Sequence, residues 1–196
     1  MNDGALIQII DAALAEAARK SGPWLVCRPG CYQCCIGPFE INQLDVRRLR
    51  AGLAAKEASD PDRAARVRTR AQDAVARLAP DFPGDQESGL LYEGEEAEER
   101  FASFANEEPC PVLDPATGTC DLYDSRPMTC RTFGPAAPAG PDSFGACELC
   151  YTGATSAEIA ACAVEFDPDD LESHLNAELE ESAGVHGRTI VAFCLG

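Results

Sequence analysis

Hydrophobic residues recur at helical spacing near the start of the 196-residue chain. One stripe is made of Leu6, Ile9 or Ile10, Ala13 or Leu14, and Ala17. Gly22-Pro23 follows this stripe, and such a dipeptide ends a helix. The pattern therefore predicts a first helix that begins near residue 3 and ends by Gly22-Pro23.

Two further stretches predict a pair of helices. Asn42 suits the N-cap of a helix from Gln43 to about Glu57, and Asp60-Pro61 suits the start of the next helix. The second helix has an apolar stripe made of Ala64, Val67, Ala71, Val75 and Leu78. Because a short connection separates the two helices, we expect them to pack antiparallel. We interpret the basic stretch 63–70 as the solvated face of the second helix.

The rest of the chain predicts shorter elements and two loops. Further helices are expected at 93–106, 156–165 and 168–183, the last capped by Asp167 and ended by Gly184. The Glu run of the first of these helices should stay solvated. Loops are expected at 81–89 and at 134–146, where Gly and Pro are frequent. Residues 188–195 form either an apolar strand or a docked tail.

Eleven cysteines add candidate chemistry to this helical pattern. Four lie in one C-x3-C-x2-C-C run, formed by Cys27, Cys31, Cys34 and Cys35. Thiolates bind zinc at about 2.3 Å and also suit iron, and Pro29-Gly30 bends the chain inside the run. Adjacent cysteines rarely serve one tetrahedral ion, because neighbouring side chains diverge. The run therefore predicts two metal centres or one polynuclear centre.

A second set of cysteines lies downstream. The segments 113–114 and 120–123 flank the turn composition Pro-Ala-Thr-Gly, which predicts a small β-hairpin that brings Cys110 and Cys120 together. Arg126-Pro127 would stop the second strand and begin a helical turn that presents Cys130. The candidate metal ligands are the nine cysteines of the two sets: Cys27, Cys31, Cys34, Cys35, Cys110, Cys120, Cys130, Cys147 and Cys150.

In these motifs the chain resembles the YkgJ-type cysteine-cluster family (CxxCxxCC), a zinc- or iron-chelating domain. The family motifs C-x3-C-x2-C-C, C-x-x-L-D, C-x-[IL]-[YF] and R-P-x-x-C-R-x-F match residues 27–35, 110–114, 120–123 and 126–133. The metal-binding region thus runs from residue 27 to about residue 150. The resemblance implies metal chelation more firmly than it implies any reaction. We expect Arg126 and Arg131 of the last motif to donate to the cofactor's sulfur ligands or to nearby carboxylates.

The chain departs from this family after Phe133. A further cysteine is expected shortly after the R-P-x-x-C-R-x-F motif, whereas Gly134 and a stretch of Pro, Ala and Gly intervene here. Either Cys147 or Cys150 then completes the set. Three aspartates among the ligands either complete an iron site or make local turn hydrogen bonds, namely Asp114, Asp121 and Asp124.

Disulfides are the alternative explanation of so many cysteines. An odd number of cysteines and an adjacent pair fit a disulfide framework poorly, and residues 1–20 lack the pattern of a signal peptide. We therefore expect free thiols and a location in the bacterial cytoplasm. Cys162 and Cys194 each stand alone in an apolar context, which is typical of buried core cysteines. With only His174 and His186, a histidine-rich catalytic metal site has few candidates.

Charge and length limit the remaining function classes. A formal net charge of -17 argues against a nucleic-acid partner and favours cations. No apolar run approaches the roughly 20 residues of a membrane-spanning helix, so no membrane partner is expected. The predicted fold is mainly α, in a single domain 1–196, with an irregular cysteine-rich metal-binding core and a small β-hairpin.

Three functions fit this fold. In the first, thiolates hold iron, including an iron–sulfur cluster, and support oxidoreductase chemistry. In the second, zinc is purely structural, and the chain is a binding module or scaffold. The third follows from a more distant resemblance to flagellin lysine N-methylases and implies a peptide-modifying enzyme with a protein or peptide substrate, although the chain has no glycine-rich nucleotide loop after a strand. The expected cofactor is therefore zinc or iron, including an iron–sulfur cluster.

Overall fold

A computed structural model describes residues 3–140 and 143–196 of the chain. The contacts between residues group the chain into two compact units. The first unit consists of residues 1–28 and 131–178, and the second unit of residues 29–130 and 179–196. We describe each unit by itself, and a single domain over 1–196 stays a prediction. The fold is mainly α-helical with small antiparallel hairpins, as the sequence predicts.

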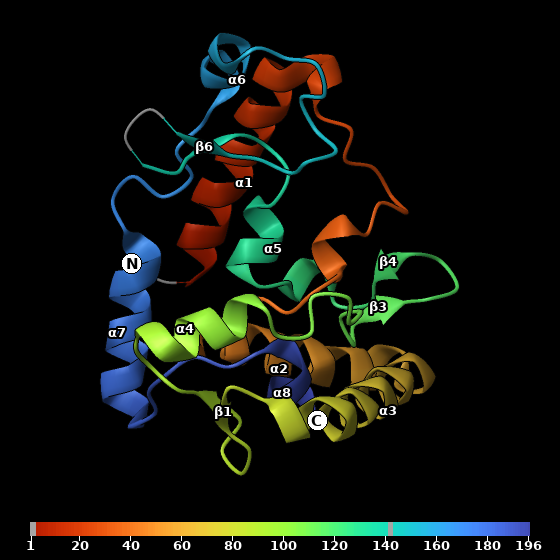
Figure 1. The fold of residues 1–196 in the computed structure, drawn as a ribbon. Helices are drawn as coiled ribbons and strands as arrows, with labels where there is room; N and C mark the ends of the chain where they lie inside the picture. The colour runs from red at the N-terminus through yellow and green to blue at the C-terminus, as the bar shows by residue number, and fades with distance from the viewer. Residues whose placement is uncertain (1–2, 141–142) are drawn as a thin grey trace. The chain divides into compact units, whose positions relative to one another are not determined.

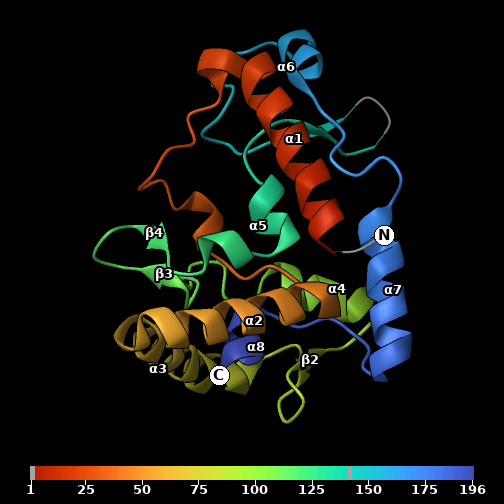
Figure 2. The same cartoon turned by 180° about the vertical axis from the view of Figure 1, so that it is seen from behind.

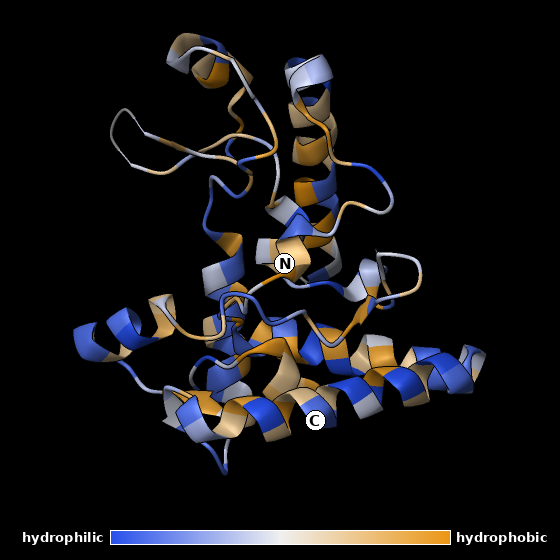
Figure 3. Cartoon of the chain, turned by 45° about the vertical axis from the view of Figure 1, so that its right-hand side comes forward, coloured by the Kyte–Doolittle hydropathy of each residue, from blue (hydrophilic) through white to orange (hydrophobic). Residues whose placement is uncertain are grey.

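The second unit is built on the predicted helical pair. Helix α2 (Gln43–Ser59) and helix α3 (Pro61–Leu78) pack against each other and against the short helix α8 (Val191–Leu195) (Figure 1). Asn42 caps α2, because its side chain accepts a hydrogen bond from the Asp45 N–H at 2.9 Å. Asp60 caps α3 in the same way, through the Arg63 N–H at 3.1 Å. In Figure 3, hydrophobic and hydrophilic residues alternate along α3, as expected for a helix with one apolar face and one polar face.

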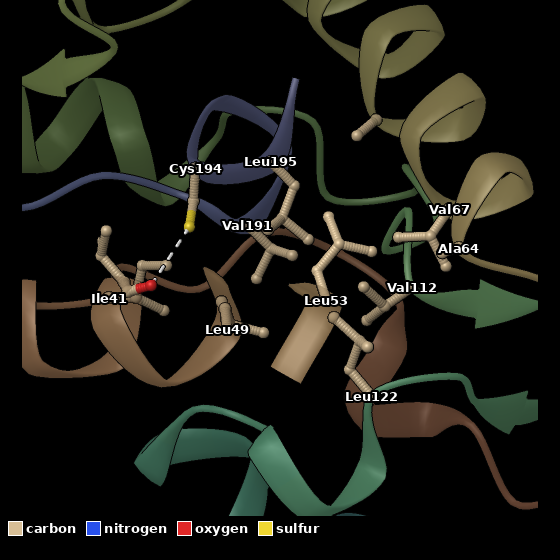
Figure 4. Close-up of a cluster of buried hydrophobic side chains, with 12 residues drawn as sticks. Ile41, Leu49, Leu53, Ala64, Val67, Val112, Leu122, Val191, Cys194 and Leu195 are labelled. Atoms are coloured by element: carbon tan, nitrogen blue, oxygen red, sulfur yellow. Dashed lines mark hydrogen bonds between the residues drawn. The ribbon is translucent and has the colours of Figure 1, made fainter. Parts of the chain in front are cut away.

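The three helices enclose a hydrophobic core, against which the candidate ligands Cys110 and Cys120 pack as partly buried residues. Leu49 and Leu53 of α2 meet Val67 of α3 and Val191 of α8, and all four are nearly inaccessible to solvent (Figure 4). Burial of side chains of this size contributes about 1.5–3 kcal/mol each. Cys194 lies in this core with its thiol 3.9 Å from the Val46 carbonyl, which confirms its prediction as a core residue.

Shorter elements of the second unit correct three expectations. The loop predicted at 81–89 contains strand β1 (Gly84–Asp85), which pairs antiparallel with β2 (Leu90–Leu91). The expected strand or tail at the end of the chain is helix α8, preceded by a single bridge between Ile41 and Thr189. The acidic helix is shorter than predicted: α4 spans Glu95–Ala102.

The first unit contains helices α1 (Asp3–Ser21) and α6 (Ser156–Cys162), which pack side by side (Figure 2). Between them in sequence, β5 (Ala137–Pro138) pairs with β6 (Phe144–Gly145) inside the predicted loop 134–146, of which residues 141 and 142 lie outside the described part. Helix α6 begins with a capping box between Thr155 and Glu158 and ends at Cys162, which is buried as expected.

Helix α7 (Leu171–Ala183) begins three residues later than predicted. The side chain of Asp167 does accept hydrogen bonds from the start of the helix, at the N–H groups of Leu171 and Glu172. Asp170, however, has φ of +51°, a left-handed conformation that helical residues do not adopt. Among the described residues, none of the helices combines the length and the apolar character that crossing a bilayer requires.

Candidate metal centre

The predicted hairpin carries two of the candidate ligands in the second unit. Strand β3 (Leu113–Asp114) pairs antiparallel with β4 (Thr119–Cys120), and Leu113 lies opposite Cys120. Asp114 organises the turn, because its carboxylate accepts hydrogen bonds from the Ala116 N–H at 3.0 Å and the Thr117 hydroxyl at 2.9 Å. The sequence left open whether Asp114 completes an iron site or makes local turn hydrogen bonds. In the structure, the Asp114 carboxylate makes the turn hydrogen bonds.

Two arginines of α3 attach this hairpin to the helical pair. Arg70 donates from Nε to the Pro111 carbonyl at 2.8 Å and from Nη2 to Asp121 Oδ2 at 2.6 Å. Arg63 Nε lies 2.8 Å from Asp121 Oδ1, at ion-pair distance. Because Pro111 follows Cys110 and Asp121 follows Cys120, Arg70 fixes the backbone beside both cysteines. In the basic stretch 63–70, Arg66 and Arg68 are exposed as expected, whereas Arg63 and Arg70 are only 34% and 24% exposed because they pair with the buried Asp121.

The C-x3-C-x2-C-C run meets this region through its backbone. A 3₁₀ turn over Gln33–Cys35 carries the adjacent cysteines, and the Cys110 N–H donates to the Cys35 carbonyl at 2.7 Å. The Gly37 N–H donates to the Glu108 carbonyl at 2.9 Å, so the two segments run antiparallel. Gly37 is needed at this crossing, because its φ is +80° and a Cβ would lie 3.2 Å from the Asn106 carbonyl oxygen.

Cys130 is presented by a short helix, α5 (Met128–Thr132), as the sequence predicts. A buried carboxylate of α2 holds the start of α5, because Asp45 accepts a hydrogen bond from the Met128 N–H at 3.0 Å. Asp45 also forms an ion pair with Arg48 at 2.7 Å, and these side chains are only 3% and 6% exposed. Cys130 is therefore attached to α2, much as Cys110 and Cys120 are attached to α3.

The thiols that these segments carry interact electrostatically. A hydrogen bond from the Cys35 thiol holds the pKa of Cys34 below its usual range, and the positive charge of Arg126 lowers it further. The same hydrogen bond, together with burial, raises the pKa of Cys35. Burial raises the pKa of Cys110 to about 12 and that of Cys120 to about 11. Burial, and then the charges of Cys110, Cys34 and Cys120, raise the pKa of Cys130.

Three of these thiols share a small cavity of the second unit. Cys34, Cys110 and Cys130 line a space of about 30 Å³, together with apolar side chains that include Phe39 and Ile190. A water molecule needs roughly 10–15 Å³ of such space, so the cavity has room for an ion. We use the name thiol cluster for Cys34, Cys35, Cys110, Cys120 and Cys130.

Four candidate ligands are not members of the thiol cluster. Cys31 is half-buried in the second unit. Cys27, Cys147 and Cys150 belong to the first unit, where Cys27 is exposed and the other two are buried. Over residues 3–140 and 143–196, no group of three or more His, Cys, Asp or Glu side chains is already arranged to hold a metal ion. Metal binding therefore requires the thiol side chains to turn towards one another.

The two arginines of the last motif have different surroundings. The guanidinium of Arg126 stacks 3.8 Å above the centre of the Tyr123 ring and donates to the Tyr123 carbonyl at 2.8 Å. Its charge lowers the pKa of both Cys34 and Cys120, so it faces the thiol cluster. Arg131 instead forms an ion pair with Asp11 of α1 at 2.8 Å, inside the first unit.

Sequence reasoning missed most of the residues that position the candidate ligands. Asp45, Arg63 and Arg70 were not among the candidate site residues, and Asp121 was considered as a metal ligand or a turn residue rather than as a partner of the two arginines. One signal for the two arginines was present in the sequence. Arg63 and Arg70 are two helical turns apart on α3, so they lie on the same side of the helix, on either side of the apolar residue Val67. Of the two histidines, His186 is exposed and its Nδ1 lies 3.7 Å from Glu180.

The comparison with known families agrees with this arrangement of cysteines. Residues 26–150, more than half of the chain, match the CxxCxxCC family, described as a putative zinc- or iron-chelating domain. The chain belongs to this family. The family description supports metal binding in general and names zinc and iron as the ions. No curated protein and no solved structure matches the chain.

The CxxCxxCC match includes both groups of thiols. It begins just before Cys27 in the first unit, passes through the thiol cluster of the second unit and ends at Cys150. The donor set fits the ions that the family description names, because thiolates are soft ligands that bind zinc and iron.

Proposed function

We propose that this protein is a thiolate metal-binding protein whose main centre is the thiol cluster of the second unit. The observation that supports this most strongly is the cavity that Cys34, Cys110 and Cys130 line together. These three cysteines come from segments that are distant in the sequence. Four thiolates complete the coordination of a zinc ion or hold an iron–sulfur cluster, and the thiol cluster offers five.

The surroundings of the thiol cluster suit a bound cation. Metal ligands must be deprotonated, and a cation releases the protons of the buried thiols when it binds. The thiol cluster would then carry several negative charges, which the bound cation and Arg126 offset. Asp45, Arg63 and Arg70 hold the ligand segments without contacting the ion, which is how outer residues tune a metal site.

Zinc and iron lead to different functions at this site. An all-thiolate zinc site is closed and stabilises the irregular segment around it, which makes the protein a structural or chelating module. An iron centre, including an iron–sulfur cluster, supplies electron-transfer chemistry and makes the protein an oxidoreductase. Free thiols as ligands suit a reducing compartment, and we assign the protein to the bacterial cytoplasm.

Anaerobic purification followed by metal analysis and an absorption spectrum tests this function. Bound zinc without visible absorption would support the structural module, and iron with visible charge-transfer bands would support the oxidoreductase. Cys130→Ser should lower the metal content, whereas Cys194→Ser, a matched change in the buried core, should leave it unchanged. Wild-type protein that binds neither metal, or Cys130→Ser protein with a full metal content, would contradict the proposal.

A further inference from the structure

The first unit brings two buried thiols together in a tight turn. In Cys147-Glu148-Leu149-Cys150, the Cys150 N–H donates to the Cys147 carbonyl at 2.9 Å. Both cysteines are 5% exposed, and the charge of Cys150 is one of the influences that, after burial, raise the pKa of Cys147. A pair of cysteines separated by two residues is a common half of a metal site, because one turn aims both sulfurs at the same point.

Gly134 contacts both a third thiol and the backbone of this turn. Its carbonyl accepts a hydrogen bond from the Cys147 N–H at 3.2 Å. A Cβ built on Gly134 would lie 2.8 Å from the Cys27 sulfur, too close for any real side chain. Gly134 has φ of +124°, a conformation that favours glycine, and its lack of a side chain leaves room for the Cys27 thiol. The Cys27 thiol and the Cys147 backbone, which come from segments more than a hundred residues apart, therefore both lie against this glycine.

The fourth cysteine of the first unit has another role. Cys162 is buried at the end of α6, and its thiol donates to the Lys20 carbonyl at 3.4 Å. It packs in the same hydrophobic cluster as Cys147 and Cys150, and its hydrogen bond joins the end of α6 to α1. Cys162 is therefore a matched control for Cys27, Cys147 and Cys150.

We propose that the first unit holds its own metal centre, in which Cys27, Cys147 and Cys150 bind one zinc or ferrous ion. This inference rests on the proposed function for the choice of ion, but it uses none of the ligands of the thiol cluster. Three thiolates leave a fourth position to water or another ligand from outside this set, a coordination that zinc accepts. The C-x3-C-x2-C-C run is then divided after Cys27, and both Cys147 and Cys150 are ligands.

The number of metal ions per chain tests this inference. Purified full-length protein is titrated anaerobically with zinc chloride, and in parallel with a ferrous salt, and the bound ions are counted by native mass spectrometry. The double variant Cys147→Ser/Cys150→Ser should bind one ion fewer than wild type and keep the rest. Gly134→Ala should weaken the binding of that same ion by at least about tenfold, since its methyl group takes the space of the Cys27 sulfur. Cys162→Ser should bind as many ions as wild type.

The other outcomes separate this inference from the proposed function. A wild-type count in the double variant would mean that the first unit has no centre, and loss of every ion would mean that all the thiols share one. Either result overturns the inference and leaves the proposed function standing. Loss of the same ion in Cys162→Ser would overturn the assignment of three thiolates. Failure of wild-type protein to bind any ion would instead overturn the proposed function. Far-ultraviolet circular dichroism checks that each variant is folded.

Discussion

Replacement of Arg70 by Met tests whether α3 positions the ligands of the thiol cluster. The change removes two hydrogen bonds that the charged guanidinium donates, one to the Asp121 carboxylate and one to the Pro111 carbonyl. Hydrogen bonds that involve a charged group contribute about 1.5–3 kcal/mol each. The Arg70 side chain is 24% exposed, so water replaces part of what is lost, and Arg63 still pairs with Asp121. The expected loss of stability is about 2–3 kcal/mol.

Arg68→Met provides the matched control for this change. Arg68 also lies on α3 and pairs with Glu57, but these side chains are 48% and 41% exposed, and such pairs contribute at most about 1 kcal/mol. Methionine keeps the apolar stem of arginine in both variants, so packing changes little. Thermal unfolding followed by circular dichroism should show a loss of about 4–12 °C for Arg70→Met, because about 1 kcal/mol shifts the midpoint by about 2–4 °C at this size.

Metal affinity gives the second measurement on the same pair of variants. Arg70 fixes the residues that follow Cys110 and Cys120, and loss of such outer contacts typically weakens metal binding about 10–100-fold. Competition with a chelator should therefore show weaker binding in Arg70→Met and unchanged binding in Arg68→Met. The positioning role is refuted if the two variants have the same midpoint and the same affinity.

Three further outcomes follow from the second unit. Asp45→Asn should cost about 3–5 kcal/mol in chemical denaturation, because it leaves the buried charge of Arg48 without its ion-pair partner, and a cost below about 1 kcal/mol would show that Arg48 is compensated elsewhere. Zinc binding at pH 7 should release protons, since burial raises the pKa of Cys110 to about 12 and that of Cys120 to about 11. Calorimetry in buffers of different ionisation enthalpy should detect the released protons, and equal heats in all buffers would contradict this expectation. Burial also raises the pKa of Cys194 from 9.0 to about 11, so its contribution to stability is complete below pH 9 and is lost as the pH rises through 11. Unfolding at pH 8 and pH 11 should show that wild type loses about 2–3 kcal/mol more than Cys194→Ala, and parallel losses would argue against it.

The elements with strong local signals were the predictable ones. Caps at Asn42 and Asp60 gave the starts of α2 and α3, because each cap bonds an N–H only three residues away. The turn residues before Thr119 predicted the β3–β4 hairpin, because a turn also depends only on residues close together in the sequence. The hairpins β1–β2 and β5–β6 have strands of two residues, too short to show alternation.

The candidate site was predictable in its ligand types but less so in its grouping. The spacing of cysteines indicates metal binding, so the nine candidate cysteines could be named from the sequence alone. Spacing does not reveal that Cys27 and Cys31, four residues apart, belong to different units. That division depends on contacts over more than a hundred residues, such as the one between Gly134 and Cys27. The bonds of Arg70 to Pro111 and Asp121 are equally non-local.

The way in which the ligand segments are held distinguishes the second unit from small metal-folded domains. A classical zinc finger is unfolded without its ion, because the metal–ligand bonds supply the folding free energy. Here the core of α2, α3 and α8 is closed by aliphatic side chains, with Leu49 and Leu53 at its centre. Buried charges at Asp45 and Asp121 then tie the irregular ligand segments to that core. We therefore expect the helical core to remain folded when the ion is removed, so that the free energy of metal binding is available for drawing the thiols together.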